Sequence, residues 1–525
     1  IVQMNYDAID AGAKQVNAVE VPESWKNCED EGLFTPEVKG GREDAVAFVK
    51  NIQAKVNAQE GNTLPVSAFK DYVDGSTPSG TAAYEKRGIA VDIPIWQSET
   101  CIQCNRCAYV CPHAAIRPVA LTEEELAKAP EGLKAIDMIG MPGMKFTMTV
   151  SAYDCTGCGS CANVCPGKKG EKALVMGNME ENAGEQVYFD FGTEIEVKPE
   201  VVAKFKENTV KGSQFKQPLL EFSGACAGCG ETPYAKLITQ LFGDRMYIAN
   251  ATGCSSIWGN SSPSTPYTVN SKGQGPAWSN SLFEDAAEFG YGMLLAQKAI
   301  REGLKAKVEE VAASDKASEE AKAACNEWLE TYGCGATNGT ATDKLVAALE
   351  GCECPTCKDI VEKKDFLAKK SQWIFGGDGW AYDIGFGGVD HVLASGKDIN
   401  VMVFDTEVYS NTGGQSSKST KTGAIAQFAA GGKETKKKDL ASIAMSYGYV
   451  YVAQIAMGAD FNQTVKAIAE AEAYPGPSLI IAYAPCINHG IKKGMSKAQT
   501  EEQLAVECGY WNNFRFNPEA EGSKF

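Results

Sequence analysis

Histidine and long apolar runs are the features that this 525-residue sequence has least of. The three histidines, His113, His391 and His489, argue against a metal centre built from imidazole ligands. No stretch approaches the roughly 20 apolar residues needed to cross a membrane, and no secretory signal pattern is present. We therefore expect a cytoplasmic protein with no membrane partner.

Positive charge is also scarce, because 50 Lys and Arg residues face 67 Asp and Glu residues, for a net charge of −17. Nucleic-acid binding rewards dense Lys/Arg patches, so we expect no nucleic-acid partner. The chain opens with Ile1 rather than Met, which we interpret as a sign of missing upstream sequence. Its length predicts two to four domains.

Cysteine, in contrast, is abundant, with 19 residues. Residues 101–112 and 155–166 both read C-x2-C-x2-C-x3-C-P. Disulfide frameworks belong to small secreted domains and zinc sites use two C-x2-C pairs, whereas this pattern is typical of a protein with two [4Fe–4S] clusters. In such proteins the fourth cysteine of each run binds the other cluster. The predicted ligand sets are Cys101, Cys104, Cys107 and Cys165 for one cluster, and Cys155, Cys158, Cys161 and Cys111 for the other.

Four further cysteines lie outside these runs, and two of them, Cys254 and Cys486, stand at the ends of expected strands. Cys226 and Cys229 form a C-x2-C pair, and Cys254 and Cys486 are single. Together they could bind a third cluster, but the pair alone is equally compatible with a redox-active, zinc-binding or incidental pair. The C-x-C-x2-C group at 352–357 could form a metal site with Cys325 or Cys334, but we favour free thiols or an incidental pattern. The seven cysteines outside the three sets are Cys28, Cys325, Cys334, Cys352, Cys354, Cys357 and Cys508.

The motifs and the hydrophobic pattern along the chain predict three parts. Residues 1–95 form a connecting region, residues 96–215 an α+β ferredoxin-like domain with the two cysteine runs, and residues 216–525 an α/β domain with a helical insertion at about 312–370. In the last part, short β-branched runs alternate with helical stretches, which predicts a parallel, doubly wound sheet. The expected strands are 246–251, 372–375, 400–404, 449–455 and 478–483, and the expected helices include 283–311, 342–349 and 462–473.

Gly377-Asp378-Gly379 directly follows an expected strand, and 405–415 follows the next one. Gly-Asp-Gly alone is usually a turn. Followed by a helix, a strand and an Asn-bearing loop, it suits a Mg²⁺–diphosphate site in which Asp378 binds the cation, with a hydroxyl and a backbone carbonyl as further ligands. The glycines would let the backbone approach the diphosphate, and the helix that opens near Trp380 would present N–H groups to it.

This combination of motifs resembles the C-terminal half of pyruvate:ferredoxin (flavodoxin) oxidoreductase, over nearly the whole chain. It is most specific at 224–233, 251–259, 376–388, 405–415 and 482–490. The resemblance implies three [4Fe–4S] clusters, thiamine diphosphate and Mg²⁺ as cofactors. It also favours the third cluster over the other interpretations of the C-x2-C pair, with ligands Cys226, Cys229, Cys254 and Cys486.

The resemblance also implies roles for residues around the expected thiamine diphosphate. Asp378, Thr406 and the carbonyl of Val408 would bind Mg²⁺; Thr406 stands where many other thiamine enzymes have Asn. Asn411 and Cys254 would act at the reacting centre. The cofactor contacts would come from Glu231, Cys254, Gly377, Asp378, Gly379, Trp380, Thr406, Glu407, Val408, Tyr409, Ser410 and Asn411.

The implied reaction is the oxidative decarboxylation of pyruvate with coenzyme A to acetyl-CoA and CO2, as in anaerobic metabolism. Electrons would leave one at a time through the three clusters to ferredoxin or flavodoxin. The family's pyrimidine-binding and CoA-binding domains have no counterpart here, so we expect this chain to be inactive without its N-terminal half, and the complete enzyme to be a homodimer. Two alternatives are a subunit of another 2-oxoacid:ferredoxin oxidoreductase, and an electron-transfer subunit without catalysis of its own.

Overall fold

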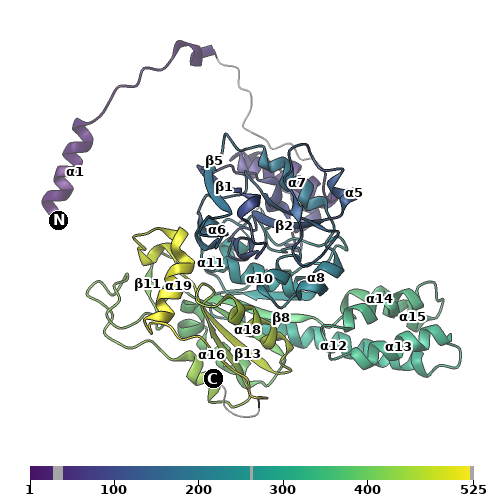
Figure 1. The fold of residues 1–525 in the computed structure, drawn as a ribbon. Coiled ribbons are helices and arrows are strands. Elements are labelled where there is room, and N and C mark those ends of the chain that lie inside the picture. Colours follow the sequence, from purple (N-terminus) through teal and green to yellow (C-terminus); the bar gives the residue numbers. More distant parts are fainter. Residues whose placement is uncertain (28–39, 261–263, 521–525) are drawn as a thin grey trace.

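A seven-stranded sheet organises the C-terminal part of the chain in the computed structural model, which describes residues 1–27, 40–260 and 264–520 (Figure 1). The strand order is β14-β12-β13-β9-β8-β6-β7, and all neighbours are parallel except β14, which is antiparallel to β12. The strands are β6 (Met246–Asn250), β7 (Ala277–Asn280), β8 (Ser371–Gly377), β9 (Ile399–Asp405), β12 (Tyr451–Ile455), β13 (Pro477–Tyr483) and β14 (Phe514–Phe516). The five expected strands are present, and the short edge strands β7 and β14 are additional.

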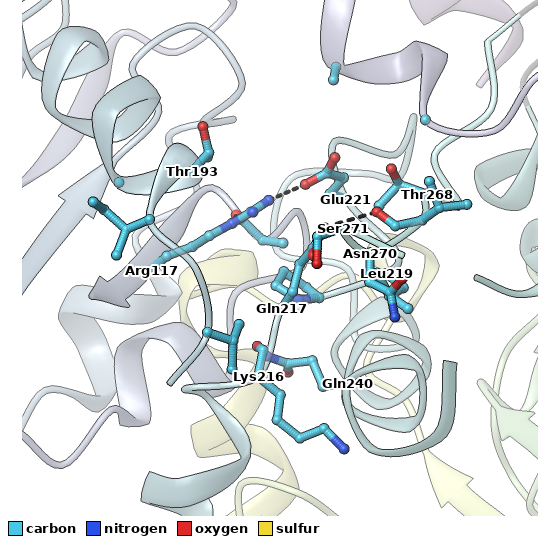
Figure 2. A pocket seen from close by; sticks show the side chains of 18 of the residues that line it. Arg117, Thr193, Lys216, Gln217, Leu219, Glu221, Gln240, Thr268, Asn270 and Ser271 are labelled. Atoms are coloured by element: carbon cyan, nitrogen blue, oxygen red, sulfur yellow. Dashed lines mark hydrogen bonds and ion pairs between the residues drawn. The ribbon is translucent and has the colours of Figure 1, made fainter. Parts of the chain in front are cut away.

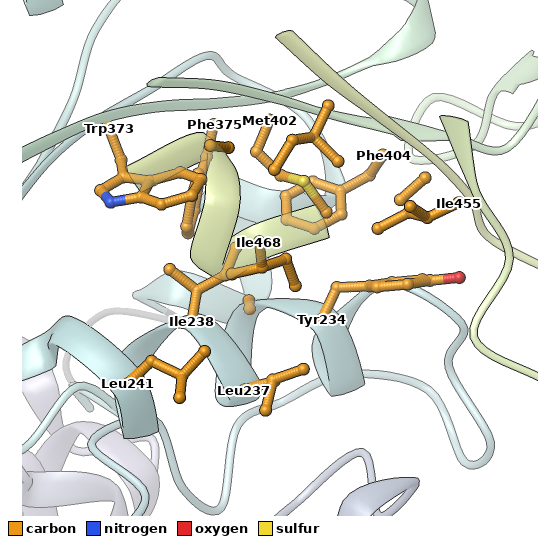
Figure 3. Close-up of a cluster of buried hydrophobic side chains, with 14 of the residues drawn as sticks. Tyr234, Leu237, Ile238, Leu241, Trp373, Phe375, Met402, Phe404, Ile455 and Ile468 are labelled. Carbon is orange, nitrogen blue, oxygen red and sulfur yellow. The ribbon is translucent and has the colours of Figure 1, made fainter. Parts of the chain in front are cut away.

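Side chains alternate between the two faces of this sheet, and helices cover both. Trp373 and Phe375 of β8 pack against α10 (Thr232–Phe242) and α18 (Phe461–Ala473), as Figure 3 shows. Ile374 of the same strand packs on the other face, with α12 (Ala286–Ala313), α16 (Phe386–Ala394), α17 (Leu440–Met445) and α19 (Ala498–Glu507). The predicted doubly wound α/β class is therefore confirmed.

The two cysteine runs lie in a smaller α+β unit. Its strands are β1 (Asp92–Trp96), which pairs with β5 (Leu174–Asn178), and β2 (Ile116–Leu121), β4 (Lys145–Val150) and β3 (Ile136–Asp137), which form a second antiparallel sheet. Its helices are α4 (Arg106–Tyr109), α5 (Glu123–Leu126), α6 (Ser160–Val164), α7 (Glu185–Glu194), α8 (Pro199–Phe205) and α9 (Val210–Ser213). Because β1 begins at Asp92, its pairing extends upstream of the expected boundary at residue 96.

The helical insertion is a small bundle with a core of its own. Its helices are α12 (Ala286–Ala313), α13 (Glu319–Thr331), α14 (Asn338–Leu349) and α15 (Pro355–Glu362). Buried Leu304 of α12, Trp328 of α13, Leu345 of α14 and Ile360 of α15 pack together. The bundle therefore includes the second half of α12, upstream of the expected start near 312, and it projects away from the sheet (Figure 1).

The N-terminal region contains α1 (Val2–Lys14), which stands apart in Figure 1, and α2 (Glu43–Phe48) and α3 (Ala54–Asn57) on either side of a π-helical turn at Val49–Gln53. Gly80 N–H donates to Tyr267 O, and Ala82 N–H donates to Thr265 O, so this region contacts the C-terminal part directly. None of the helices in the described ranges is long and apolar enough to span a membrane.

Shorter elements complete the fold. Residue 254 begins α11 (Cys254–Gly259), and β10 (Val408–Tyr409) pairs with β11 (Gln415–Ser416) in a hairpin. A second π-helical turn covers Gly379–Ile384. The 3-10 turns are Glu23–Asn27, Gly61–Thr63, Val66–Tyr72, Thr81–Tyr84, Ser98–Thr100, Gly243–Arg245, Lys364–Phe366, Ile487–His489 and Met495–Lys497.

Candidate functional site

Four predicted site residues follow directly after neighbouring parallel strands. Cys254 follows β6, Asp378 follows β8, Thr406 follows β9, and Cys486 follows β13. Parallel strands place their carboxyl ends at one edge of the sheet, which is where ligands bind in open α/β folds. The topology therefore gathers two predicted cluster cysteines and two predicted Mg²⁺ ligands at the same edge.

The three predicted Mg²⁺ ligands meet around one hydroxyl. Thr406 Oγ1 lies 3.1 Å from Asp378 Oδ1 and 2.9 Å from Val408 O. The backbone N–H of Thr406 also donates to Asp378 Oδ1 at 3.2 Å, and Ser417 Oγ donates to Asp378 Oδ2 at 2.5 Å. A carboxylate, a hydroxyl and a carbonyl oxygen thus converge, which is the oxygen-rich donor set that Mg²⁺ prefers.

Asp378 is 1% exposed, and its hydrogen-bond partners are hydroxyl and backbone N–H groups rather than cations. Burial, followed by the nearby Asp405 carboxylate, raises its pKa well above the ordinary value. A divalent cation at this position would offset both effects, since it places two positive charges beside the buried carboxylate. The residues present therefore fit a bound Mg²⁺.

Asp405 and Glu407 are held by a lysine that the sequence did not single out. Lys437 Nζ lies 2.7 Å from Asp405 Oδ2 and 3.0 Å from Glu407 Oε1, and Tyr510 OH donates to the other Glu407 oxygen. The Glu407 carboxylate is therefore engaged away from Asp378. Its backbone adopts a left-handed φ of 61°, which turns the chain between Thr406 and Val408.

The glycines of the Gly-Asp-Gly loop differ in their surroundings. A Cβ at Gly379 would lie 2.5 Å from the Tyr409 ring, so this glycine makes room for a side chain rather than for a ligand. A Cβ at Gly377 would meet only Phe404 O, at 3.9 Å, so its backbone remains open to a diphosphate. Trp380 is fully buried, and Asn411 is exposed on the loop that follows β10.

The four cysteines of the expected third cluster lie within electrostatic reach of one another. The pKa of Cys254 is raised by burial and then by Glu231, with further contributions from Cys229 and Cys486. The pKa of Cys486 is raised by burial, with a smaller contribution from Cys226. Glu231 is buried close to Cys229, Cys254 and Cys486, and it accepts a hydrogen bond from Trp258 Nε1 at 2.7 Å. Gly230 N–H donates to Pro485 O, which ties the C-x2-C loop to the Cys486 loop.

Two contacts connect this cysteine set to the loop after β9. Cys254 Sγ lies 3.1 Å from Ser410 Oγ. His489 Nε2 donates to Thr406 O at 2.6 Å while its Nδ1 accepts from the backbone N–H of Cys486 at 3.2 Å. His489 therefore bridges a predicted cluster ligand and a predicted Mg²⁺ ligand, a role that its position in the sequence did not indicate.

The eight cysteines of the two runs surround two small cavities in the crossed arrangement. One cavity is lined by Cys101, Cys104, Cys107 and Cys165, and the other by Cys111, Cys155, Cys158 and Cys161. The first is also lined by Trp96, whose buried Nε1 has no partner among the described residues. A cluster sulfide would supply the missing acceptor, so the cavity fits a [4Fe–4S] cluster.

Both loops take the same backbone path. Gln103 and Asn105 in the first run, and Gly157 and Gly159 in the second, have positive φ at equivalent positions. This path points a backbone N–H back at the first sulfur of each run, with N–S distances of 3.4 Å at Cys101 and at Cys155. The sulfur atoms of Cys229 and Cys486 likewise each accept from the backbone N–H of the residue two positions later in the chain. Such N–H groups stabilise thiolates and tune cluster potentials.

The described residues contain no group of three or more His, Cys, Asp or Glu side chains placed to hold a single metal ion. A [4Fe–4S] cluster binds each of its four thiolates through a different iron, so its ligands surround a larger space. Cys28 lies outside the described residues.

The cysteine unit and the sheet domain are joined at the cysteine loops. The backbone of Gly228, in the C-x2-C loop, lowers the pKa of Cys158, so it lies against this thiol. His113, next to Cys111 and Pro112, makes a 3.1 Å hydrogen bond from Nδ1 to Ser223 O. Lys236 of α10 is 1% exposed and donates to the carbonyls of Ala108 and Tyr109 in α4.

A further cavity lies away from these sites. It has a volume of about 1120 Å³ and lies between the cysteine unit, the region around Gly80 and the start of the sheet domain. Figure 2 shows Arg117 and Glu221 paired across it, with Lys216 and Gln240 below. None of the predicted cluster, Mg²⁺ or thiamine diphosphate residues lines it.

Known domain families match three segments of the chain. Residues 36–90 match a domain of unknown function, residues 100–169 a 4Fe-4S dicluster domain, and residues 363–482 the C-terminal TPP binding domain of thiamine pyrophosphate enzymes. The matched ranges contain the two cysteine runs and the loops with Asp378 and Thr406.

Curated relatives match almost the whole chain. It is 56% identical to the pyruvate-flavodoxin oxidoreductase of Enterobacter agglomerans and 55% identical to the pyruvate:ferredoxin oxidoreductase of Moorella thermoacetica, covering 99% of this chain and 44% of each relative. It is 45% identical to the mitochondrial pyruvate dehydrogenase [NADP(+)] of Euglena gracilis, over 99% of this chain and 28% of that protein. The chain thus spans less than half the length of these relatives. Over nearly its whole length the chain is therefore similar to pyruvate:ferredoxin (flavodoxin) oxidoreductases, and it carries a 4Fe-4S dicluster domain and a thiamine pyrophosphate-binding domain.

Proposed function

We propose that this chain is the electron-transfer and thiamine diphosphate-binding portion of an enzyme that converts pyruvate and coenzyme A to acetyl-CoA and CO2. Electrons would leave singly through three [4Fe–4S] clusters to ferredoxin or flavodoxin. The observation that carries this proposal is the 3.1 Å contact between Cys254, of the third cysteine set, and Ser410, on the loop that follows the Mg²⁺ ligands.

The expected cofactors have complementary chemistry. Bound thiamine diphosphate supplies an electron sink for decarboxylation of a 2-oxo acid, and bound [4Fe–4S] clusters carry electrons one at a time. Asp378, Thr406 and the Val408 carbonyl would hold Mg²⁺, and the open backbone at Gly377 would face the diphosphate. Ser410 and His489 would fix this loop against the third cysteine set.

The contacts between cysteine sets support a linear order. The set of Cys226, Cys229, Cys254 and Cys486 adjoins the thiamine diphosphate loops, and its Gly228 lies against Cys158. The set that contains Cys158 is followed by the Cys101 set, because Cys107 of that set lies close enough to Cys161 to raise its pKa. Ile102, in the first run, is 42% exposed, so the outermost set lies near the surface where an external carrier would dock.

Further parts of the proposal concern the remainder of the enzyme. The first relatives are more than twice as long as this chain, so the missing length would supply the other contacts to thiamine diphosphate and the coenzyme A site. A homodimer of the complete enzyme remains part of the proposal. Iron–sulfur ligation requires reduced thiols, which a cytoplasmic location would provide.

The test is to measure viologen reduction by the complete enzyme, reconstituted without oxygen, with thiamine diphosphate, Mg²⁺ and coenzyme A. Pyruvate should support reduction, and 2-oxoglutarate should not. Preference for 2-oxoglutarate would assign the chain to another 2-oxoacid oxidoreductase. If neither acid supports viologen reduction and the preparation binds no thiamine diphosphate, the chain would be an electron-transfer subunit without catalysis of its own.

A further inference from the structure

The helical insertion carries three cysteines that the proposed function does not use. Cys352 and Cys354 lie between α14 and α15, and Cys357 lies in the first turn of α15. The sequence favoured free thiols without a role for this C-x-C-x2-C group. The structure brings the three thiols together at the start of α15. The helical bundle that contains α15 projects away from the sheet (Figure 1).

The local backbone explains why Cys354 and Cys357 face each other. Cys354 is the N-cap residue of α15, with φ −62° and ψ 131°, and Pro355 takes the first helical position, where its missing N–H has no cost. Cys357 is then the third helical residue. An N-cap side chain and the side chain three positions later lie together, as in a capping box.

The two thiols differ in exposure. Cys354 is exposed, whereas Cys357 is 4% exposed and packs in the core of the bundle beside Ile360 and Leu345. Cys352 is intermediate in exposure and packs against the same core. An oxidant from solvent can therefore reach Cys354 first.

The pKa values of the two thiols also differ, and the exposed Cys354 is the more acidic. The backbone N–H groups of Cys357 and Thr356 lower the pKa of Cys354, although none forms a full capping hydrogen bond to it. Burial, and then the neighbouring Cys352 and Cys354 thiols, raise the pKa of Cys357 to about 12. The exposed thiol is thus the better nucleophile, and the buried one stays protonated behind it.

Charged neighbours of the site are already paired. Lys358 pairs with Glu353, Lys307 pairs with Asp359, and Thr356 Oγ1 donates to Glu310 Oε1 at 3.1 Å. The last two contacts attach the start of α15 to α12. The thiols are therefore held by the bundle rather than by a flexible loop.

We propose that Cys354 and Cys357 form a thiol–disulfide exchange site, with Cys354 as the attacking thiol and Cys357 as the resolving thiol. The Cys354 thiolate attacks a low-molecular-weight disulfide, forms a mixed disulfide and releases one thiolate. Cys357 then passes its proton to that thiolate and attacks Cys354 Sγ, which releases the second. Two protein thiols are oxidised to one disulfide, and one small disulfide is reduced to two thiols.

The test uses the full chain with its clusters, exposed to glutathione disulfide without oxygen. Trypsin cleavage after Lys344 and Lys358 releases residues 345–358, whose only cysteines are Cys352, Cys354 and Cys357. Mass spectrometry of this peptide should show an internal disulfide in the wild type. Cys357→Ser should instead accumulate a glutathione adduct at Cys354, and Cys354→Ser should slow thiol loss about tenfold or more.

Matched controls keep the proposal falsifiable even if Ser at the buried position 357 unfolds the bundle. Cys352→Ser should behave as the wild type does. Cys334, exposed on the same bundle with a lowered pKa, should gain only a glutathione adduct. The proposal is overturned if the wild-type peptide stays reduced or keeps an unresolved adduct, if Cys352→Ser abolishes the internal disulfide, or if stoichiometric zinc protects the three thiols.

Discussion

Cys254 and Ser410 are 156 residues apart in the sequence, yet Cys254 Sγ and Ser410 Oγ lie 3.1 Å apart. One follows β6 and the other lies on the loop after β9, with β8 between these strands in the sheet. This contact joins the cysteine set nearest the sheet to the loop that carries the predicted Mg²⁺ ligands.

The first prediction concerns the number of clusters. Iron analysis of the reconstituted chain should give about twelve iron atoms, since three [4Fe–4S] clusters are expected. Cys254→Ala removes one ligand of the third set and should lower the content to about eight. Cys334→Ala, at an exposed cysteine of the helical bundle, should leave iron unchanged. About eight iron atoms in the wild type would refute the third cluster.

The second prediction concerns Asp378. Asp378→Asn keeps the shape of the side chain but removes the charge that would bind Mg²⁺, so affinity for Mg²⁺–thiamine diphosphate should fall about 100-fold or more. The cofactor-free chain should not lose thermal stability, because the substitution also relieves repulsion from Asp405. Calorimetric titration and thermal unfolding measure these two effects separately.

Asp398→Asn is the matched control, because Asp398 pairs with Lys369 at the surface, before β9. It should bind the cofactor as the wild type does. Retention of wild-type affinity by Asp378→Asn would remove Asp378 from the metal site. A large loss of stability without cofactor would show instead that Asp378 has a structural role.

The sequence predicted the parts of the site that depend on local pattern. The spacing of the two cysteine runs, and the position of Asp378 and Thr406 directly after β8 and β9, follow from short segments. Parallel strands then bring such segments to one edge whatever the intervening chain does. These features needed no knowledge of long-range packing.

The residues that sequence reasoning missed act across long separations. Lys437 reaches back to Asp405, and His489 reaches Thr406 from 83 residues away. Neither residue belongs to a sequence motif whose spacing would predict its contact. Gly379 was expected to admit the diphosphate, but its neighbour is the Tyr409 ring, which depends on how the hairpin after β9 folds over the loop.

The third prediction concerns Lys437. It is the cation that two buried carboxylates share, so Lys437→Met should destabilise the chain by about 3 kcal/mol or more, because Asp405 is left buried and unpaired. Adding Asp405→Asn to this variant should recover part of the loss. Urea unfolding followed by tryptophan fluorescence measures both. Lys436→Met, at the exposed neighbouring lysine, should change stability little.

The fourth prediction concerns Glu502, a fully buried residue of α19. Its carboxyl accepts hydrogen bonds from Tyr234 OH at 3.1 Å and from Gly458 N–H at 2.6 Å, yet burial raises its pKa to about 8. Gln499 Nε2 donates to its other oxygen, while Gln499 Oε1 is buried without a partner among the described residues. Rotating the Gln499 amide would let a protonated Glu502 donate to that orphan oxygen.

An acid whose folded-state pKa is raised above its unfolded value binds more protons in the folded state. Its contribution to stability is complete below the unfolded pKa and is lost as the pH rises through about 8. Raising the pH from about 6 to about 9 should therefore destabilise the wild type relative to Glu502→Gln, by on the order of 2 kcal/mol. Glu501→Gln, one residue away, should follow the wild type. Parallel pH curves for wild type and Glu502→Gln would mean that three donors keep Glu502 ionised throughout.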